Sequence, residues 1–179
     1  MESRKFVILC KDDGTPTGTV DILEAHTGKG LLHRAFSIYL FRNDRKEILV
    51  QKRSKEKMLW PNIWANTCCS HSQEKEDIIE TGQRRLQEEF GFTHSLKESL
   101  SYVYRAEDPS GRGSEHEYVT ILVGDITNEV NPQPNPSEIS EWKWIEVPVL
   151  QEDINKNPKD YAPWFCLGLQ KLHSVLLPT

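Results

Sequence analysis

The chain has 179 residues, of which 37% are hydrophobic and 27% are charged, with only 10 glycines and 10 prolines. This length is enough to bury one self-sufficient core, and the composition excludes collagen-like, coiled-coil and disordered low-complexity proteins. The formal net charge of -5, from 27 acidic and 22 basic residues, argues against a nucleic-acid partner that is held by many phosphate contacts.

Two short strand-like runs open the chain. Residues 6–10 and 17–20 flank the turn at residues 11–14, and this pattern predicts a β-hairpin. Residues 35–41 are apolar on both alternating faces, as in a central strand that is buried on both sides. Residues 48–50 follow a polar turn and are predicted to pair with that central strand.

One helix is predicted in the middle of the chain and another near its end. Apolar residues repeat at helical spacing over residues 76–90, and Gly91 follows as a stop. Further strands are predicted at residues 102–104, 115–123 and 142–145. Pro163 then opens the last helix, since proline is favoured in the first turn. No repeat or shift in composition marks a second domain, so the order of elements predicts a single α/β sandwich with one mixed sheet covered by helices.

The cysteines and the apolar runs bear on the cellular compartment. No apolar run approaches the ~18 to 20 residues that span a bilayer, and the basic start lacks the features of a secretory signal. The four cysteines are few for this length, and Cys68 and Cys69 are adjacent, which is poor geometry for a disulfide. We therefore expect a cytoplasmic protein with reduced thiols and no membrane partner.

Two carboxylates stand in a predicted strand where apolar side chains are expected. Alternation places Glu115 and Glu117 on the same face as Val119 and Ile121. Burying them without partners would cost several kcal/mol each, so a buried pair needs a metal, a proton or a cation. If this end of the strand lies in solvent, the pair has no special role.

Three histidines lie near bends of the chain. His26 and His33 bracket a glycine-rich turn, and His71 follows Cys69 in an extended segment. Together with the two glutamates of the later strand, they would suit a divalent ion that accepts nitrogen and oxygen ligands, such as Mn²⁺, Zn²⁺ or Mg²⁺. Each of these histidines taken singly is typical of a surface or hydrogen-bonded residue, so the hypothesis depends on the whole set.

Charged residues of the central helix and of the preceding loop suggest an anion site. Arg85 and Glu89 are one helical turn apart. They either form an ion pair worth about 0.2–0.5 kcal/mol, or Arg85 faces an anionic ligand while Glu89 faces the metal region. Arg53 and Lys57 follow a predicted strand. They either complete a cationic pocket for a diphosphate or lie on a solvated loop.

The region of residues 70–92 resembles the Nudix box, a loop-helix-loop whose helix carboxylates hold Mg²⁺ on a diphosphate. The resemblance lies in the pattern Ser70-x5-Glu76-x7-Arg84-Arg85-Leu86-Gln87-Glu88-Glu89-Phe90-Gly91-Phe92. Ser70 replaces the opening glycine, and Arg85 replaces the glutamate that follows the arginine. This departure removes a carboxylate of the hydrolytic metal cluster and argues against hydrolysis of nucleoside diphosphates.

Three more segments are similar to the type 1 isopentenyl diphosphate isomerases, a branch of the Nudix superfamily. They are GLLHRAFS at 30–37, NTCCSH at 66–71, and YRAEDP at 104–109 followed by Glu115-His116-Glu117. The matches run from Phe6 to Trp164. The resemblance implies a Nudix-like α/β/α sandwich over residues 1–179, and isomerisation of isopentenyl diphosphate to dimethylallyl diphosphate through a tertiary carbocation.

The resemblance also implies roles for individual residues. Cys69 and Glu117 are the catalytic acid and base, in an order that stays open, and Tyr104 assists Glu117. Trp164 faces the hydrocarbon of the substrate; by spacing alone it is a core residue of the last helix. The diphosphate is bound by Arg53, Lys57 and Arg85.

Two metal ions are implied by the same resemblance, and no flavin. One divalent ion, Mn²⁺, Zn²⁺ or Mg²⁺, is bound by His26, His33, His71, Glu115 and Glu117. A Mg²⁺ ion on the substrate diphosphate is held by Glu89 and the backbone carbonyl of Cys69. Many members of the family have a further diphosphate-binding lysine four residues before His26, where this chain has Ile22, and Lys29 and Lys11 are candidates to supply that charge.

Two other functions compete with the isomerase. One is a Nudix hydrolase that acts on a nucleotide or another diphosphate. The other is a non-catalytic module in which Cys68, Cys69 and the histidines close a structural Zn²⁺ site. The helix pair and the two strand glutamates favour the isomerase, for which we expect a small isoprenoid diphosphate as partner and a monomer or weak dimer.

Overall fold

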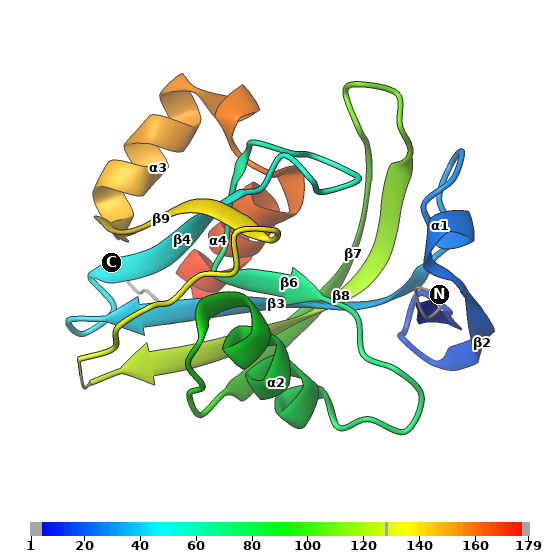
Figure 1. Ribbon diagram of the computed structural model, residues 1–179, viewed down its shortest axis with the longest axis horizontal. Coiled ribbons are helices and arrows are strands. Elements are labelled where there is room, and N and C mark those ends of the chain that lie inside the picture. The colour runs from blue at the N-terminus through cyan, green and yellow to red at the C-terminus, as the bar shows by residue number, and fades with distance from the viewer. Residues whose placement is uncertain (1–4, 128, 177–179) are drawn as a thin grey trace.

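The computed structural model describes residues 5–127 and 129–176, and Figure 1 shows the arrangement of their elements. The strands of its nine-stranded sheet are β1 Phe6–Cys10, β2 Pro16–Asp21, β3 His33–Arg42, β4 Glu47–Arg53, β5 Trp64–Ala65, β6 Cys68–Ser70, β7 Lys97–Glu107, β8 Ser114–Ile126 and β9 Ile139–Glu146. The α-helices are α1 Ile22–Ala25, α2 Ile78–Phe90, α3 Val147–Lys156 and α4 Pro163–Leu176, with a 3-10 turn at Pro158–Asp160. The predicted α/β class with one mixed sheet is confirmed.

Strand β3 is the centre of the sheet. It pairs with β8 in parallel along its whole length, and with β1, β6 and β4 in antiparallel. Because a strand has only two edges, β6 and β8 lie on opposite sides of β3. The parallel register sets His33 opposite Glu117, and the antiparallel register sets Ser37 opposite Cys69. The sheet therefore brings together residues from three distant parts of the sequence.

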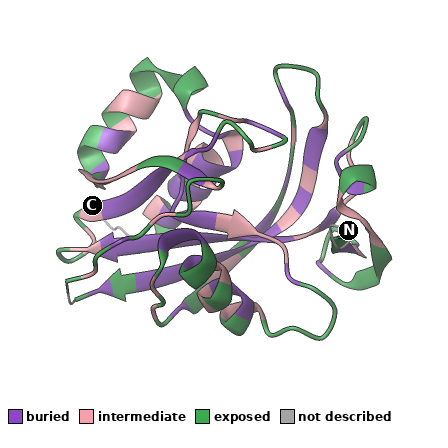
Figure 2. Ribbon diagram, viewed as in Figure 1, coloured by how far each residue is buried: buried purple, intermediate pink, exposed green. Residues whose placement is uncertain are grey.

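The two faces of β3 enter different cores, as its apolar alternation predicts. Phe36 and Leu40 pack in a core with Leu86 and Phe90 of α2, whereas Tyr39 packs in a second core with α3 and α4. Buried residues accordingly run along β3, β4 and β8 between the helices (Figure 2). These layers form the expected α/β/α sandwich.

Helix α2 has clear start and stop signals. The side chain of Asp77 accepts hydrogen bonds from the backbone N–H groups of Ile79 and Glu80 and so caps the helix. The helix therefore begins at Ile78, two residues after the predicted start at Glu76. It ends at Gly91, whose φ of 74° is in the left-handed region that favours glycine. The predicted C-terminal helix also begins at Pro163.

Some elements were not predicted from the pattern. Helix α1 has four residues and depends on the Asp21 side chain, which accepts from the backbone N–H of Leu23. Helix α3 follows β9 directly with a proline in its first turn, and its ten residues are too few for their apolar pattern to predict a helix. Among the described residues, no helix has both the length and the apolarity to cross a membrane.

Candidate active site

A cavity of about 730 Å³ is lined by Ala35 and Phe36 of β3 and by side chains from both sides of the sheet. This volume lies within the roughly 300–1,000 Å³ typical of small-molecule sites. Cys69 from β6 and Glu117 from β8 line the same cavity, together with Trp164 from α4. Because β6 and β8 flank β3, Cys69 and Glu117 reach this cavity from opposite edges of β3, and Ala35 of β3 lies between them.

Four buried or half-buried side chains converge beside this cavity, and all of them except His33 line it. They offer ligand atoms that all lie within 4.8 Å of one another, and they are His26, His33, His71 and Glu117. Nε2 of His71 lies 3.1 Å from Nε2 of His33 and 3.1 Å from Oε1 of Glu117. Three imidazoles and one carboxylate that point at one spot form a donor set suited to a borderline divalent cation.

The backbone orients two of these imidazoles. Nδ1 of His26 lies 2.7 Å from the carbonyl oxygen of Ile22, and Nδ1 of His33 lies 2.7 Å from that of Leu31. A carbonyl accepts a hydrogen from Nδ1, which leaves the Nε2 lone pair free to bind a metal. Burial lowers the pKa of His71 to about 4, so this imidazole is neutral at pH 7, as a metal ligand must be.

Glu115 was expected among the metal ligands, but the structure gives it a different partner. It does not belong to the group of four converging ligands, and its carboxylate accepts a hydrogen bond from the hydroxyl of Tyr104. Burial, with a contribution from the nearby charge of Glu117, raises the pKa of Glu115 to about 8. Of the two strand carboxyls, Glu115 is therefore the one that holds a proton more readily.

Tyr104 was expected to assist Glu117, and the structure directs its hydroxyl to Glu115 instead. The backbone register pairs Tyr104 with Glu117, and Glu115 is the diagonal neighbour on the same face, within reach of a long aromatic side chain. Burial alone would raise the pKa of Glu117, but the adjacent imidazoles of His33 and His71 outweigh it and hold this pKa well below its usual range. Glu117 is therefore ionised.

The Cys69 thiol faces an arginine. Nη1 of Arg53 lies 3.6 Å from Sγ of Cys69, and the guanidinium also donates to the backbone carbonyls of Trp60 at 3.0 Å and Leu59 at 2.9 Å. Burial raises the pKa of Cys69 to about 12, and the charge of Arg53 only partly opposes that rise. The thiol keeps its proton at neutral pH, and Arg53 is buried rather than on a solvated loop.

Trp164 lines the cavity, and buried neighbours hold its side chain in place. Its Nε1 donates to Oδ1 of Asn66 at 3.0 Å, and its ring meets that of Trp60 edge to face at 5.4 Å. The guanidinium carbon of Arg53 lies 5.1 Å from the centre of the ring. Trp164 therefore belongs both to the core and to the wall of the cavity.

Lys57 and Arg85 meet at a carboxylate that the sequence pattern did not reveal. Oε2 of Glu138 lies 2.6 Å from Nζ of Lys57, and its Oε1 lies 3.2 Å from Nη2 of Arg85. Glu138 stands in the irregular segment before β9, where no periodicity marks it. Nε of Arg85 is buried and has no hydrogen-bond partner among the residues that the structure describes.

Glu89 is buried beneath Arg85. Its Oε1 lies 2.6 Å from Nη2 of Arg85, and its Oε2 accepts from the side-chain amide of Gln51 at 3.4 Å. Burial raises the pKa of Glu89 despite the nearby guanidinium. Its carboxylate thus faces Arg85, and the Mg²⁺ expected on Glu89 and the Cys69 carbonyl stays a prediction.

The two adjacent cysteines face opposite sides of the sheet. Cys68 is buried in the core on the α2 side, whereas Cys69 packs against the other core and lines the cavity. Successive residues of a strand must diverge in this way. A structural Zn²⁺ site that uses both thiols is therefore wrong.

A metal-binding cluster of this kind should stabilise the fold when it is filled. Mn²⁺, Zn²⁺ or Mg²⁺ at 100 times its dissociation constant adds about 2.7 kcal/mol to the free energy of unfolding. For a chain of this size we expect the Tm to rise by about 5–10 °C. Thermal unfolding with and without EDTA measures the shift.

Two histidine variants provide the control for that experiment. His71→Ala should lose most of the increase in Tm, because it removes one ligand of four. His94→Ala should keep it, because the half-buried His94 is not one of the four converging ligands and its imidazole contacts the backbone carbonyl of Asp125 instead. Equal shifts in both variants would show that the ions bind elsewhere.

Comparisons with known proteins agree with this geometry. A family model described as NUDIX domain matches residues 31–165. A curated relative from Halorhodospira halophila is 37% identical over 161 residues, which cover 90% of this chain and 91% of the relative. Another, from Aliivibrio fischeri, is 40% identical over 167 residues, with the same two coverages. Both relatives are named isopentenyl-diphosphate Delta-isomerase.

Solved structures with lower identity share the fold. A protein of Deinococcus radiodurans superimposes with a TM-score of 0.74 at 16% identity, over 93% of this chain and 98% of that chain. An Ap4A hydrolase of C. elegans gives a TM-score of 0.57 at 20% identity, over 80% of this chain and 97% of that chain. At these identities, the likeness concerns the fold alone.

Proposed function

Because the chain belongs to the NUDIX family and matches relatives named isopentenyl-diphosphate Delta-isomerase over most of its length, we propose that it converts isopentenyl diphosphate to dimethylallyl diphosphate. One observation of the site carries this proposal. A thiol that keeps its proton, Cys69, and an ionised carboxylate, Glu117, line one cavity from strands on either side of β3.

The reaction needs this combination because it moves a double bond by one position. One proton is added to the terminal alkene carbon, and another is removed from the carbon nearer the diphosphate. A relay of this kind requires one group that holds a proton and one group that can accept it. Cys69 and Glu117 meet the two requirements. After one turnover Cys69 has lost a proton and Glu117 has gained one, so Cys69 must take up a proton from water and Glu117 must release one to water before the next turnover.

The tertiary carbocation between the two transfers must be shielded from water and stabilised. The cavity wall at Trp164 offers an aromatic face, and a desolvated cation gains about 2 kcal/mol or more from such a face. Tyr104 and Glu115 lie beside Glu117, and burial raises the pKa of both groups, which favours their uncharged forms. Glu117 is thus the main negative charge near the hydrocarbon at this end of the cavity.

The diphosphate is assigned to Arg53, Lys57 and Arg85. All three line the cavity, and Nε of Arg85, which has no partner within residues 5–127 and 129–176, is a donor that a phosphate oxygen can use. When bound, a divalent ion at the histidine cluster supplies positive charge that keeps Glu117 ionised, and a Mg²⁺ ion carried in on the diphosphate neutralises its charge beside Glu89.

The cysteines of the enzyme bear on the compartment in which it works. Its four cysteines are free, which agrees with a reducing cytoplasm. Its partner is a small isoprenoid diphosphate, and it acts as a monomer or a weak dimer.

Two assays on the purified chain test the proposed reaction. With Mg²⁺ and Mn²⁺ present, isopentenyl diphosphate should be converted to dimethylallyl diphosphate, and ADP-ribose should release no phosphomonoester. Arg85 stands where a hydrolytic Nudix box has a carboxylate, which is why hydrolysis is not expected. Cleavage of ADP-ribose without isomerisation would replace the proposal with its hydrolase alternative.

A further inference from the structure

Five cationic residues among those described line the cavity, and they differ in what holds them. They are Lys5, Arg53, Lys57, Arg84 and Arg85. The guanidinium of Arg53 is held by two backbone carbonyls, and Lys57 is paired with Glu138. Arg84 pairs with Glu76 and Glu88, and Arg85 pairs with Glu88, Glu89 and Glu138. Carboxylates therefore already offset the charge of three of the five.

Lys5 is the exception. It is exposed, and it forms no ion pair with any residue in the ranges 5–127 and 129–176. A diphosphate brings several negative charges into a cavity whose other lysine and arginines are largely neutralised or held in place. A lysine of this cavity whose charge is not offset by a carboxylate among the described residues is therefore favourably placed to bind the diphosphate.

The backbone holds Lys5 against the element that carries a metal ligand. The carbonyl of Lys5 accepts from the backbone N–H of Ile22 at 2.9 Å. Ile22 begins α1 and also lines the cavity, and its own carbonyl lies 2.7 Å from Nδ1 of His26. The position of Lys5 is thus tied through Ile22 to the histidine cluster.

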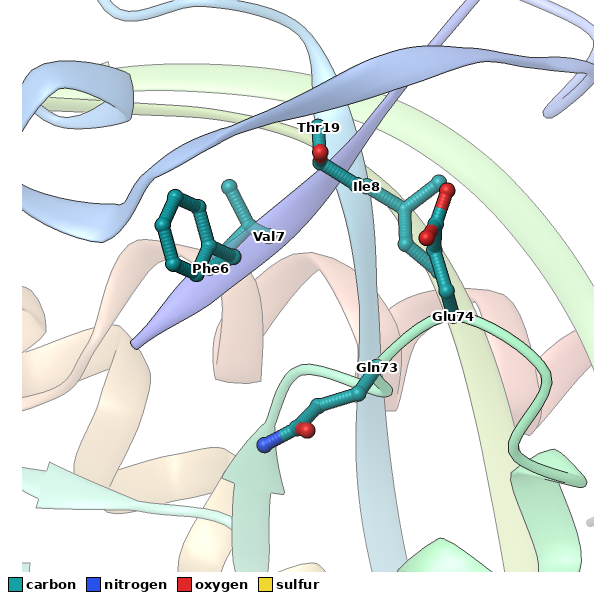
Figure 3. A pocket seen from close by; sticks show the side chains of 6 residues that line it. All are labelled: Phe6, Val7, Ile8, Thr19, Gln73 and Glu74. Atoms are coloured by element: carbon teal, nitrogen blue, oxygen red, sulfur yellow. The ribbon is translucent and has the colours of Figure 1, made fainter. Parts of the chain in front are cut away.

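The next residue, Phe6, is about half exposed and also lines the cavity. Phe6 and Gln73 line both the main cavity and a neighbouring hollow of about 290 Å³. Figure 3 shows β1 beside the loop that carries Gln73 and Glu74. Lys5, the residue before β1, therefore reaches the cavity beside the first residue of α1.

We propose that Lys5 binds the diphosphate of the substrate and supplies the positive charge for which Lys29 and Lys11 were the candidates from sequence. Lys29 and Lys11 are exposed, and neither is among the described residues that line the cavity. This inference rests on the proposed function, because it assigns one more contact to the substrate of that site. The proposal adds the residue that precedes β1 to the diphosphate-binding residues of the active site.

Calorimetry with inorganic pyrophosphate and Mg²⁺ tests the contact without any turnover. Lys5→Gln should bind pyrophosphate about tenfold more weakly than the unmodified chain, because it loses one charge-assisted contact to a phosphate oxygen. Lys5→Arg should bind within a few-fold of the unmodified chain. Lys11→Gln and Lys29→Gln are matched controls with the same change in charge, and both should bind like the unmodified chain.

A second substitution tests the location as well as the charge. Ile22→Lys, added to Lys5→Gln, should restore most of the lost affinity, because position 22 lines the same cavity and bonds the backbone of residue 5. Unchanged binding by Lys5→Gln would overturn the inference, and so would equal losses in the Lys11 and Lys29 controls. Absence of pyrophosphate binding by the unmodified chain would overturn it too.

The same variants separate this inference from the proposed function. If the unmodified chain binds pyrophosphate through Lys5 but does not isomerise isopentenyl diphosphate, the proposed function fails and the Lys5 contact stands. If the unmodified chain isomerises and Lys5→Gln keeps its KM, the function stands and the contact is wrong. Where both hold, Lys5→Gln should raise KM about tenfold and change kcat little.

Discussion

Replacing Cys69 with alanine should lower kcat for isomerisation by about 10³-fold, within the range that positioned acid–base groups contribute. The Cys69 thiol faces the cavity next to Arg53 and keeps its proton at neutral pH. Alanine cannot hold or transfer that proton. Isopentenyl diphosphate turnover by Cys69→Ala, measured against the unmodified chain at saturating substrate, gives the ratio of the two kcat values.

Cys166 provides the matched control. It is a half-buried cysteine of α4 that packs against the same core but is not among the described residues that line the cavity. Cys166→Ala should keep kcat within a few-fold of the unmodified value. Near-normal turnover in Cys69→Ala, with its thermal unfolding unchanged, would remove the thiol from the proposed relay.

Replacing Glu117 with glutamine should abolish both metal binding and turnover. Oε1 of Glu117 lies 3.1 Å from Nε2 of His71 and 3.5 Å from Nε2 of His33. An amide of the same shape carries no charge, so it binds a divalent ion weakly and cannot accept a proton as a carboxylate does. We expect kcat to fall by about 10³-fold, and the metal content to fall from near one ion per chain to a small fraction.

Elemental analysis after gel filtration measures the metal content, and the turnover assay measures the rate. Glu107→Gln is the matched control, because Glu107 is an exposed glutamate of the neighbouring strand β7. It should retain the ion and the rate. Full metal content in Glu117→Gln would contradict the assignment of the cluster, whereas full turnover would contradict the role of Glu117 as proton acceptor.

Local patterns predicted the elements that depend on neighbouring residues. The apolar alternation of residues 35–41 identified the strand that both cores bury, because each face of β3 meets a different layer. The glycine at position 91 marked the end of α2, because a left-handed residue is needed there. Helix α1 was missed, because four residues carry no helical period.

The candidate site depends on distant pairings, which local patterns do not specify. The register of β3 with β8 sets His33 beside Glu117, and that pairing joins residues 84 positions apart in the sequence. The motifs named most residues of the site, but they did not indicate that Tyr104 would bond Glu115. That contact forms because the pairing of β7 with β8 makes Glu115 the diagonal neighbour of Tyr104 on the same face of the sheet.

The residues of the site without a motif were found only in three dimensions. Glu138 and Lys5 reach the cavity from an irregular segment and from the residue before the first strand. Neither position shows a periodicity or a spacing that marks it. Both became visible because the fold places them beside Lys57, Arg85 and Ile22.

Deuterium exchange tests the central claim most directly, since it follows the protons themselves. Isopentenyl diphosphate incubated with the chain and divalent ions in D₂O should gain deuterium at the methyl group formed from the terminal alkene carbon. On prolonged incubation, the carbon next to the diphosphate-bearing one should gain it as well. Cys69→Ala and Glu117→Gln should each abolish this uptake. Product formed without deuterium, or uptake that persists in both variants, would contradict a proton relay between these two groups.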